Sequence, residues 1–270
     1  LVVHMTGLGH LAISRSLIVR TVRGLVFSHL RRLTARPDTW LIVENPEDLA
    51  VLTAAGIQPG HRVSILPGAG VDPEVYTPAP APAGDPPTVA YAGRMIHSKG
   101  VTDLVAAHDL LADRGIALDV RLYGRLDDGN PEAISAAEIE AWTRRPRLSW
   151  LGHVNDVREI WRTADVSVLP AREREGMPRA LLEAAACGRP LVVTNVPGCR
   201  HFVRDGVEGL IVPPGDPPRL ADALACLAGD HELRQRMGTA ARQRLIEGFT
   251  EAHVVDAVAT VYRRILEERH

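Results

Sequence analysis

The sequence predicts an α/β protein of two lobes, each built around a parallel sheet. Short apolar strand patterns alternate with helix patterns along most of the 270 residues, which is typical of parallel sheets covered by helices on both faces. The length exceeds that of a usual single domain. A stretch rich in Pro and Ala at 77–87 (TPAPAPAGDPP) can continue neither a helix nor a central strand, so it divides the lobes.

The first lobe, residues 1–77, reads as strand, glycine turn, long helix, strand, helix and strand. The expected strands are 2–5, 40–43 and 62–66, and the expected helices are 13–35 and one that starts at 46. Leu1 leads directly into an apolar strand. We therefore expect 1–77 to be the later part of a larger domain, with further chain before it.

The second lobe, residues 88–248, follows a linker at 78–87 and is expected to be a complete sheet domain. Its predicted strands are 89–92, 118–123, 148–150, 166–169, 191–193 and 210–212, and its predicted helices are 101–114, 131–144, 157–164 and 178–187. Residues 249–270 are expected to form a C-terminal helix that packs back toward the first lobe.

Composition excludes several classes of protein. A net charge of -2 and 46% hydrophobic residues describe an ordinary globular protein and give no general reason to expect nucleic acid as a partner. Three cysteines without a CxxC pair indicate neither a zinc site nor a disulfide framework. No apolar run reaches the roughly 20 residues of a membrane span. We expect a cytoplasmic protein.

Two cations stand in the loop after the strand predicted at 89–92. The loop reads GRMIHSKG, and its Lys99 is the single lysine among 31 basic residues. Ligands of parallel sheets bind beyond the carboxyl ends of the strands, where backbone N–H groups and cations can hold phosphate. Solvated loop cations are the alternative. Arg94 and Lys99 therefore predict a diphosphate site.

A second motif runs from a loop into the helix predicted at 178–187. Pro178 suits the first helical position, and Gly188 suits the position after the last turn. Unpaired N–H groups from Gly176 to Arg179, with the helix dipole behind them, would attract the same diphosphate.

Two carboxylates flank the start of this helix. Glu175 precedes it, and Glu183 lies about 7.5 Å along its axis, at 1.5 Å per residue. A nucleotide sugar carries hydroxyl groups on its hexose and on its ribose, and a carboxylate can accept paired hydrogen bonds from either. Glu183 could instead face solvent, but it interrupts an alanine-rich run in which a carboxylate needs a partner.

These motifs resemble glycosyltransferase family 4, whose members have the retaining GT-B fold. The resemblance rests on GRxxxxKG at 93–100, the spacing of Glu175 and Glu183, the pattern EAxAxGxPLV, and the segments 196–198 and 205–214, and it covers 40–264. It implies an α/β GT-B architecture with a complete C-terminal Rossmann-like domain and the last part of an N-terminal one.

The resemblance also implies roles for single residues. Arg94 and Lys99 would bind the diphosphate, Glu175 with the backbone of 176–178 the sugar hydroxyls, and Glu183 the ribose. Gly124 and the segment around His153 would border the base. The donor site implied in this way is Arg94, Lys99, Gly124, His153, Val154, Glu175, Gly176, Met177, Pro178, Leu182 and Glu183, with Arg94, Lys99 and Glu175 as its catalytic residues. His4 is left without a role.

The implied reaction moves a hexose or N-acetylhexosamine from a nucleotide diphosphate, most simply UDP, to a glycan or a polyprenyl-diphosphate-linked acceptor with retention. Segments 6–9, 70–72 and 129–134 are similar to the subgroup that extends undecaprenyl-diphosphate-linked glycans. No metal or other cofactor is expected, because the two cations would neutralise the diphosphate. Asp127 and Asp128 are interpreted as a turn.

Three alternatives compete with this interpretation, and the sequence disfavours two of them. The chain could bind a nucleotide sugar without transferring it, because part of the acceptor lobe would be missing. A sugar-nucleotide epimerase shares the GT-B architecture, but its hallmark residues do not coincide with Glu175 and Glu183. A Rossmann dehydrogenase is disfavoured, because no GxGxxG follows the first strand of the second lobe.

The helix predicted at 13–35 is basic and amphipathic. Its apolar positions recur at helical spacing and predict one buried stripe, made of Ile18, Val22, Val26, Leu30 and Leu33. Six arginines lie in or beside it without an acidic residue between them: Arg15, Arg20, Arg23, Arg31, Arg32 and Arg36. Either the arginines are simply solvated, or they meet anionic lipid headgroups. We expect a peripheral protein on the inner face of the cell membrane.

Overall fold

Two parallel sheets organise the chain. The structure is a computed structural model that describes residues 1–8, 16–57, 60–80 and 84–267. Within these residues the first sheet has the order β1-β2-β3 and the second has the order β6-β5-β4-β7-β8-β9. All the strand pairs are parallel, so each sheet needs crossover segments that return over its faces.

The N-terminal lobe, residues 1–66, holds the smaller sheet. Its strands are β1 (Val2–Met5), β2 (Trp40–Val43) and β3 (Val63–Ile65), and its helices are α2 (Leu17–Thr34) and α3 (Pro46–Ala54). Successive residues of a strand point to opposite faces. One face of β2 therefore packs against α2 and α3, in a cluster that includes Leu41, Val43, Phe27, Leu30 and Leu52.

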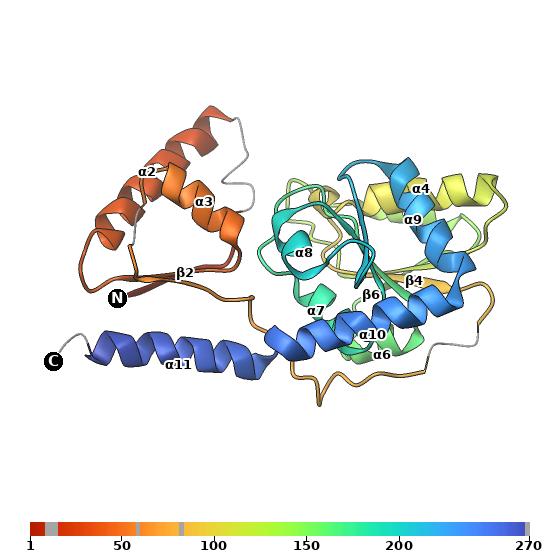
Figure 1. The fold of residues 1–270 in the computed structure, drawn as a ribbon. Helices are drawn as coiled ribbons and strands as arrows, with labels where there is room; N and C mark the ends of the chain where they lie inside the picture. Colours follow the sequence, from red (N-terminus) through yellow and green to blue (C-terminus); the bar gives the residue numbers. More distant parts are fainter. Residues whose placement is uncertain (9–15, 58–59, 81–83, 268–270) are drawn as a thin grey trace.

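The last helix covers the other face of this small sheet. Helix α11 (Glu251–Glu267) places Val261 against Trp40, Ile42 and Leu66. In Figure 1 the sheet lies between α2 and α3 on one side and α11 on the other. Alternate residues of β2 thus belong to two separate hydrophobic clusters, one on each face of the sheet.

The C-terminal lobe, residues 88–248, holds the larger sheet. Its strands are β4 (Thr88–Ala92), β5 (Asp119–Tyr123), β6 (Leu148–Gly152), β7 (Val166–Leu169), β8 (Leu191–Thr194) and β9 (Gly209–Val212). Its helices are the short 3-10 helix η1 (His97–Lys99), α4 (Val101–Asp113), α5 (Ala136–Thr143), α6 (Arg158–Thr163), α7 (Arg179–Ala186), α8 (Pro197–Phe202), α9 (Pro217–Gly229) and α10 (His231–Gly248). Helices α4 and α9 lie over one face, and α6, α7 and α10 over the other (Figure 1).

The chain crosses between the lobes twice, and the two crossings touch. The Val71 N–H donates to the Phe249 carbonyl and the Glu251 N–H donates to the Val71 carbonyl, each at 3.3 Å. Gly70 has a φ of +69°, and a Cβ there would lie 2.7 Å from the Thr250 backbone. Only glycine meets both demands without strain. These residues form the connection between the two lobes.

The structure corrects some predicted elements. The helix predicted at 131–144 begins only at Ala136, because Ser135 and Glu138 form a capping box that fixes the start there. Helices α8, α9 and α10 were not predicted as elements. The remaining predicted boundaries differ from the observed ones by two residues or fewer, except at the start of the first helix and the end of the last, where residues 13–15 and 268–270 lie outside the described residues.

Helix α2 differs most from expectation. Of the stripe predicted to be buried, Ile18 is 77% exposed and Val22 is 46% exposed, and Leu17 and Leu25 are exposed beside them. The reason is length: an 18-residue helix spans about 27 Å, whereas four-residue strands span about 13 Å. The small sheet therefore buries only the later turns of α2. No helix in the described part of the chain is long and apolar enough to cross a membrane.

Candidate active site

The loop after β4 is packed tightly against the end of β7. Gly100 has a φ of +72°, and a Cβ on it would lie 1.8 Å from the Pro170 carbonyl oxygen. This close approach requires glycine. It brings Lys99, at the end of η1, to the loop that follows β7, and that loop contains Glu175.

Lys99 and Glu175 form an ion pair. The Lys99 Nζ lies 2.5 Å from the Glu175 Oε1, and the two side chains are 18% and 16% exposed. The residue predicted to bind phosphate, Lys99, and the residue predicted to bind the sugar, Glu175, are therefore in direct contact. A phosphate group that approached Lys99 would compete with Glu175 for it.

Glu183 has the partners that its buried position requires. Its Oε1 accepts from the Tyr76 hydroxyl at 3.1 Å and from the Arg179 Nε at 3.0 Å. Arg179 precedes it by one turn of α7, and Tyr76 comes from the crossing between the lobes. Burial raises the pKa of Tyr76, and the neighbouring Glu183 carboxylate acts in the same direction. The phenol therefore stays a hydrogen-bond donor.

Two cavities adjoin at Arg94. The larger, of about 690 Å³, is lined by Arg94, Gly124, His153, Val154, Arg179 and Glu183 among others. The smaller, of about 480 Å³, is lined by Arg94, Lys99, Asn130, Glu132, Arg174 and Glu175 among others. Arg94 is the basic residue common to both. Its side chain is 63% exposed, and its Nη1 lies 3.8 Å from the Asp127 Oδ2 in a long ion pair.

The turn predicted at Asp127 is present. Asp127 accepts from the Asn130 Nδ2 at 3.1 Å, which closes the turn on itself. In the described part of the chain, no three His, Cys, Asp or Glu side chains gather closely enough to hold a metal ion.

Four predicted donor-site residues line neither of these cavities. They are Gly176, Met177, Pro178 and Leu182. Leu182 is 1% exposed and belongs to the core of the C-terminal lobe. Their assignment to the donor site stays a prediction.

The expectation of an unpaired N–H group was wrong at Met177, and the expectation that Pro178 is the first helical residue was also wrong. The Met177 N–H donates to the Glu44 Oε2 at 2.9 Å, so a carboxylate of the other lobe already satisfies it. Pro178 is the residue before the first helical residue, not the first helical residue itself. Burial raises the pKa of Glu44 to about 7, against the opposing effect of the Met177 N–H.

Sequence reasoning missed several residues of the site. Arg179 could have been found, because it stands four residues before Glu183 on one helix face. Tyr76 carries no such signal, because its contact with Glu183 spans 107 residues. Arg174 and Glu44 were missed for the same reason.

Comparison with known proteins gives one family match. Residues 86–230 match the family described as glycosyl transferases group 1. The capsular polysaccharide biosynthesis glycosyltransferase CapM of Staphylococcus aureus is 27% identical over 180 residues, which are 67% of this chain and 47% of CapM. The alpha-maltose-1-phosphate synthase of Mycolicibacterium smegmatis is 32% identical over 244 residues, which are 85% of this chain and 58% of that protein. The chain thus spans about half the length of these curated relatives.

Solved structures confirm the predicted GT-B type α/β fold. Sucrose-phosphate synthase from Thermosynechococcus elongatus superposes with a TM-score of 0.82 at 23% identity. The matched region covers 99% of this chain and 68% of the synthase chain. Anabaena HepE, solved with UDP and glucose, also has a TM-score of 0.82, at 18% identity, and covers 97% of this chain and 71% of its own. At this level of identity the likeness establishes the fold alone.

Proposed function

Since the chain belongs to the glycosyl transferases group 1, we propose that it binds a UDP-sugar in cavities of its C-terminal lobe and takes part in sugar transfer. The sugar would be a hexose or N-acetylhexosamine, and the acceptor a glycan or a polyprenyl-diphosphate-linked glycan. The transfer would retain the configuration at the anomeric carbon.

The observation that carries this proposal is the pair of cavities that meet at Arg94. The larger has Glu183 in its wall and the smaller has Lys99 and Glu175. A nucleotide diphosphate sugar has the matching order of groups: a nucleoside with hydroxyls, a doubly charged link, and a sugar with hydroxyls. We place the nucleoside in the larger cavity, the diphosphate at Arg94 and Lys99, and the sugar beside Glu175.

Binding would exchange the partner of Lys99. The diphosphate would replace the Glu175 carboxylate at the Lys99 Nζ, because a phosphate brings more charge to the ammonium. Glu175 would then be free to accept hydrogen bonds from the sugar hydroxyls. The ion pair thus keeps both groups neutralised and close to the positions in which they would meet the donor.

Arg94 and Lys99 would also lower the barrier to transfer. Negative charge builds on the diphosphate as the bond to the anomeric carbon breaks, and fixed cations stabilise that charge. Since two cations are at hand, we propose that the reaction needs neither a metal ion nor another cofactor. The leaving phosphate would accept the proton of the acceptor hydroxyl.

The exposed face of α2 supports a peripheral location at the inner face of the cell membrane. Leu17, Ile18, Val22 and Leu25 are exposed there, and Arg20, Arg31 and Arg32 are exposed on the same helix. An apolar face flanked by arginines can lie in a lipid interface and attract anionic headgroups. The plainer alternative is that the arginines are solvated and another protein surface covers the apolar face.

Calorimetric titration tests donor binding. We expect the 270-residue chain to bind UDP-glucose or UDP-N-acetylglucosamine, and to bind UDP more weakly than the accepted UDP-sugar. Absence of binding to UDP and to every UDP-sugar at millimolar concentration would refute the proposal.

A turnover assay separates transfer from binding. UDP release that depends on a lipid-linked oligosaccharide, with the sugar recovered on that oligosaccharide, would establish transfer. Binding without turnover by the same folded chain would favour the alternative, a nucleotide-sugar-binding module.

A further inference from the structure

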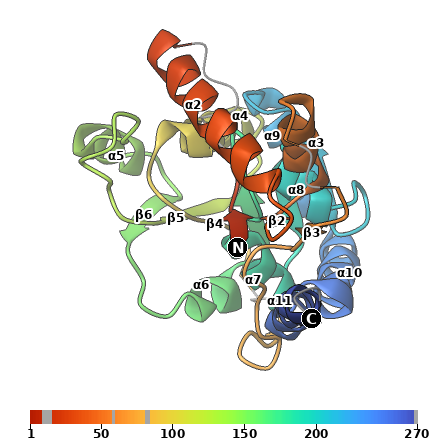
Figure 2. The same cartoon turned by 90° about the vertical axis from the view of Figure 1, so that its left-hand side faces the viewer.

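The loop that carries Glu175 contacts the opposite lobe at several points. We call residues 173–178 the donor loop, since under the proposed function Glu175 meets the donor sugar. The loop belongs to the C-terminal lobe, between β7 and α7. Its partners, Glu44 and Asp48, lie just after β2 and in the first turn of α3. Both belong to the N-terminal lobe, which faces the viewer in Figure 2.

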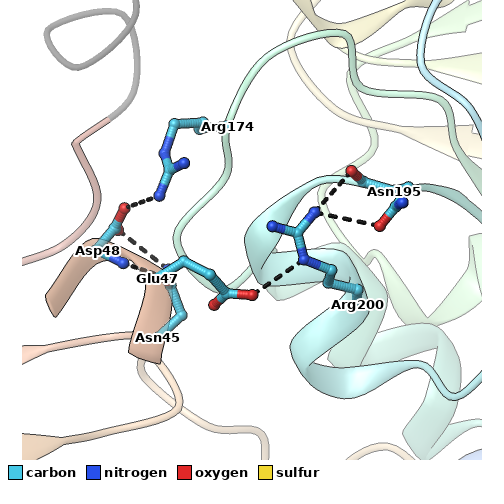
Figure 3. A network of polar contacts seen from close by, with 6 residues as sticks. All are labelled: Asn45, Glu47, Asp48, Arg174, Asn195 and Arg200. Carbon is cyan, nitrogen blue, oxygen red and sulfur yellow. Dashed lines mark hydrogen bonds and ion pairs between the residues drawn. The ribbon is translucent and has the colours of Figure 1, made fainter. Parts of the chain in front are cut away.

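The first contact is a partly buried ion pair. The Arg174 Nη2 lies 2.8 Å from the Asp48 Oδ1, and the side chains are 19% and 1% exposed. The other oxygen of Asp48 accepts from the Asn45 Nδ2 at 3.0 Å. Asn45 also caps α3 by accepting the Asp48 N–H at 2.8 Å. Figure 3 shows Asp48 held by Asn45 and turned toward Arg174. The Asp48 carboxylate is thus held by a residue of its own lobe as well as by Arg174.

The second contact leaves no room at Gly176. Beside the bond from the Met177 N–H to Glu44, a Cβ on Gly176 would lie 2.0 Å from the Glu44 Oε2 and 2.4 Å from the Thr6 carbonyl oxygen. Both atoms belong to the N-terminal lobe. Gly176 is therefore required by the fit between the lobes and not by its own backbone angles.

A third cross-lobe contact lies outside the donor loop. The Arg200 Nε lies 3.0 Å from the Glu47 Oε1, and the side chains are 36% and 35% exposed. Arg200 stands on α8 and also donates to Asn195 (Figure 3). This pair joins the same two lobes without touching the donor loop, so it provides a matched control.

We propose that Asp48 and Glu44 of the N-terminal lobe act as positioning residues, which lock the donor loop in place through Arg174 and the Met177 N–H when the lobes close. In the open state the loop loses both anchors, and Glu175 is no longer held toward the sugar. Closure would then be coupled to capture of the sugar end of the donor.

Lobe separation tests the lock without any ligand. The exposed Cys226 and a Thr53→Cys substitution on α3 provide labelling sites in the two lobes for single-molecule energy transfer. We expect Asp48→Asn, Arg174→Gln and Gly176→Ala each to shift the population toward larger separations. Gly229→Ala is the steric control, because a Cβ there meets nothing within 4 Å.

Donor affinity tests the positioning role. The apparent affinity for the UDP-sugar falls in proportion to the fraction of closed molecules. A tenfold smaller closed fraction therefore predicts an affinity about tenfold lower. We expect Arg174→Gln to lower the affinity for the UDP-sugar about tenfold and the affinity for UDP less than threefold. The Arg200→Gln control should not discriminate between the two ligands. The double variant of Arg174 and Asp48 should bind the UDP-sugar no more weakly than the weaker-binding single variant, because both substitutions remove the same ion pair.

The outcomes are distinct. Unchanged lobe separation in Asp48→Asn and Gly176→Ala would overturn the lock. Opened lobes with equal losses for UDP and UDP-sugar in Arg174→Gln would overturn the positioning role. A wild-type chain that binds no UDP-sugar would refute the proposed function, whereas the ligand-free separations would still decide whether the lock exists.

Discussion

The two lobes present their apolar surface in different ways. The six-stranded sheet of the C-terminal lobe has helices over both faces, and its core forms one large cluster. The three-stranded sheet of the N-terminal lobe sits between two small clusters, and four large apolar side chains of α2 remain exposed. Under the proposed function this difference separates two roles: the C-terminal lobe would hold the donor, and the exposed face of α2 would offer the N-terminal lobe a surface for other contacts.

The largest expected effect tests the N-terminal surface. Replacement of Arg20, Arg31 and Arg32 by Gln should weaken binding to anionic vesicles by about 3 kcal/mol, at about 1 kcal/mol for each arginine. Sedimentation with vesicles of phosphatidylglycerol and phosphatidylcholine measures this. The control replaces three exposed arginines of the C-terminal lobe, Arg144, Arg219 and Arg236. If binding of the wild type to vesicles depended neither on salt concentration nor on lipid charge, that result would count against the membrane role of α2.

The next effect tests the cations of the C-terminal lobe. Lys99→Ala or Arg94→Ala should weaken UDP by about 1.5–3 kcal/mol, because each removes a charge-assisted contact with phosphate. We expect Arg94→Ala at the lower end, since its side chain is 63% exposed. Isothermal titration calorimetry is the measurement. Equal affinity of both variants and the wild type for UDP would refute the placement of the diphosphate.

The two carboxylates should differ in which ligand they affect. Glu183→Ala should weaken UDP itself by about 1–2 kcal/mol through lost hydrogen bonds. Glu175→Ala should leave UDP unchanged or slightly tighter, because it removes the competitor of phosphate for Lys99, and should weaken only the UDP-sugar. Titrations of both variants with UDP and with the accepted UDP-sugar check this. Equal losses for the two ligands in Glu175→Ala would contradict the division.

The smallest effect concerns pH at the contact between the lobes. Burial raises the pKa of Glu44 from 4.5 to about 7, so between these values the folded state binds more protons than the unfolded state. Glu44 therefore makes the free energy of unfolding fall as pH rises from about 4.5 to about 7. Glu44→Gln should remove this contribution and raise the melting temperature relative to the wild type at pH 8 more than at pH 5. A difference that is the same at both values would exclude the buried carboxylate as its source.

Much of the fold follows from local patterns in the sequence. The apolar strands at 89–92 and 166–169 and the helix between Pro178 and Gly188 were predicted within two residues, because strand and helix periodicities are local properties. The exposed half of α2 could not be predicted, since amphipathic spacing marks a face and not the size of the sheet beneath it.

The sequence by itself determined which chemical groups are present and which segment carries each: a single lysine after one strand, and two carboxylates beside one helix. The tertiary structure alone decided how those groups are paired. Lys99 meets Glu175 across 76 residues of chain, and Glu44 meets the Met177 N–H across 133. Spacing in a sequence fixes distance only within one element, where the backbone is regular. Between elements, packing at glycines such as Gly100 and Gly176 sets the approach.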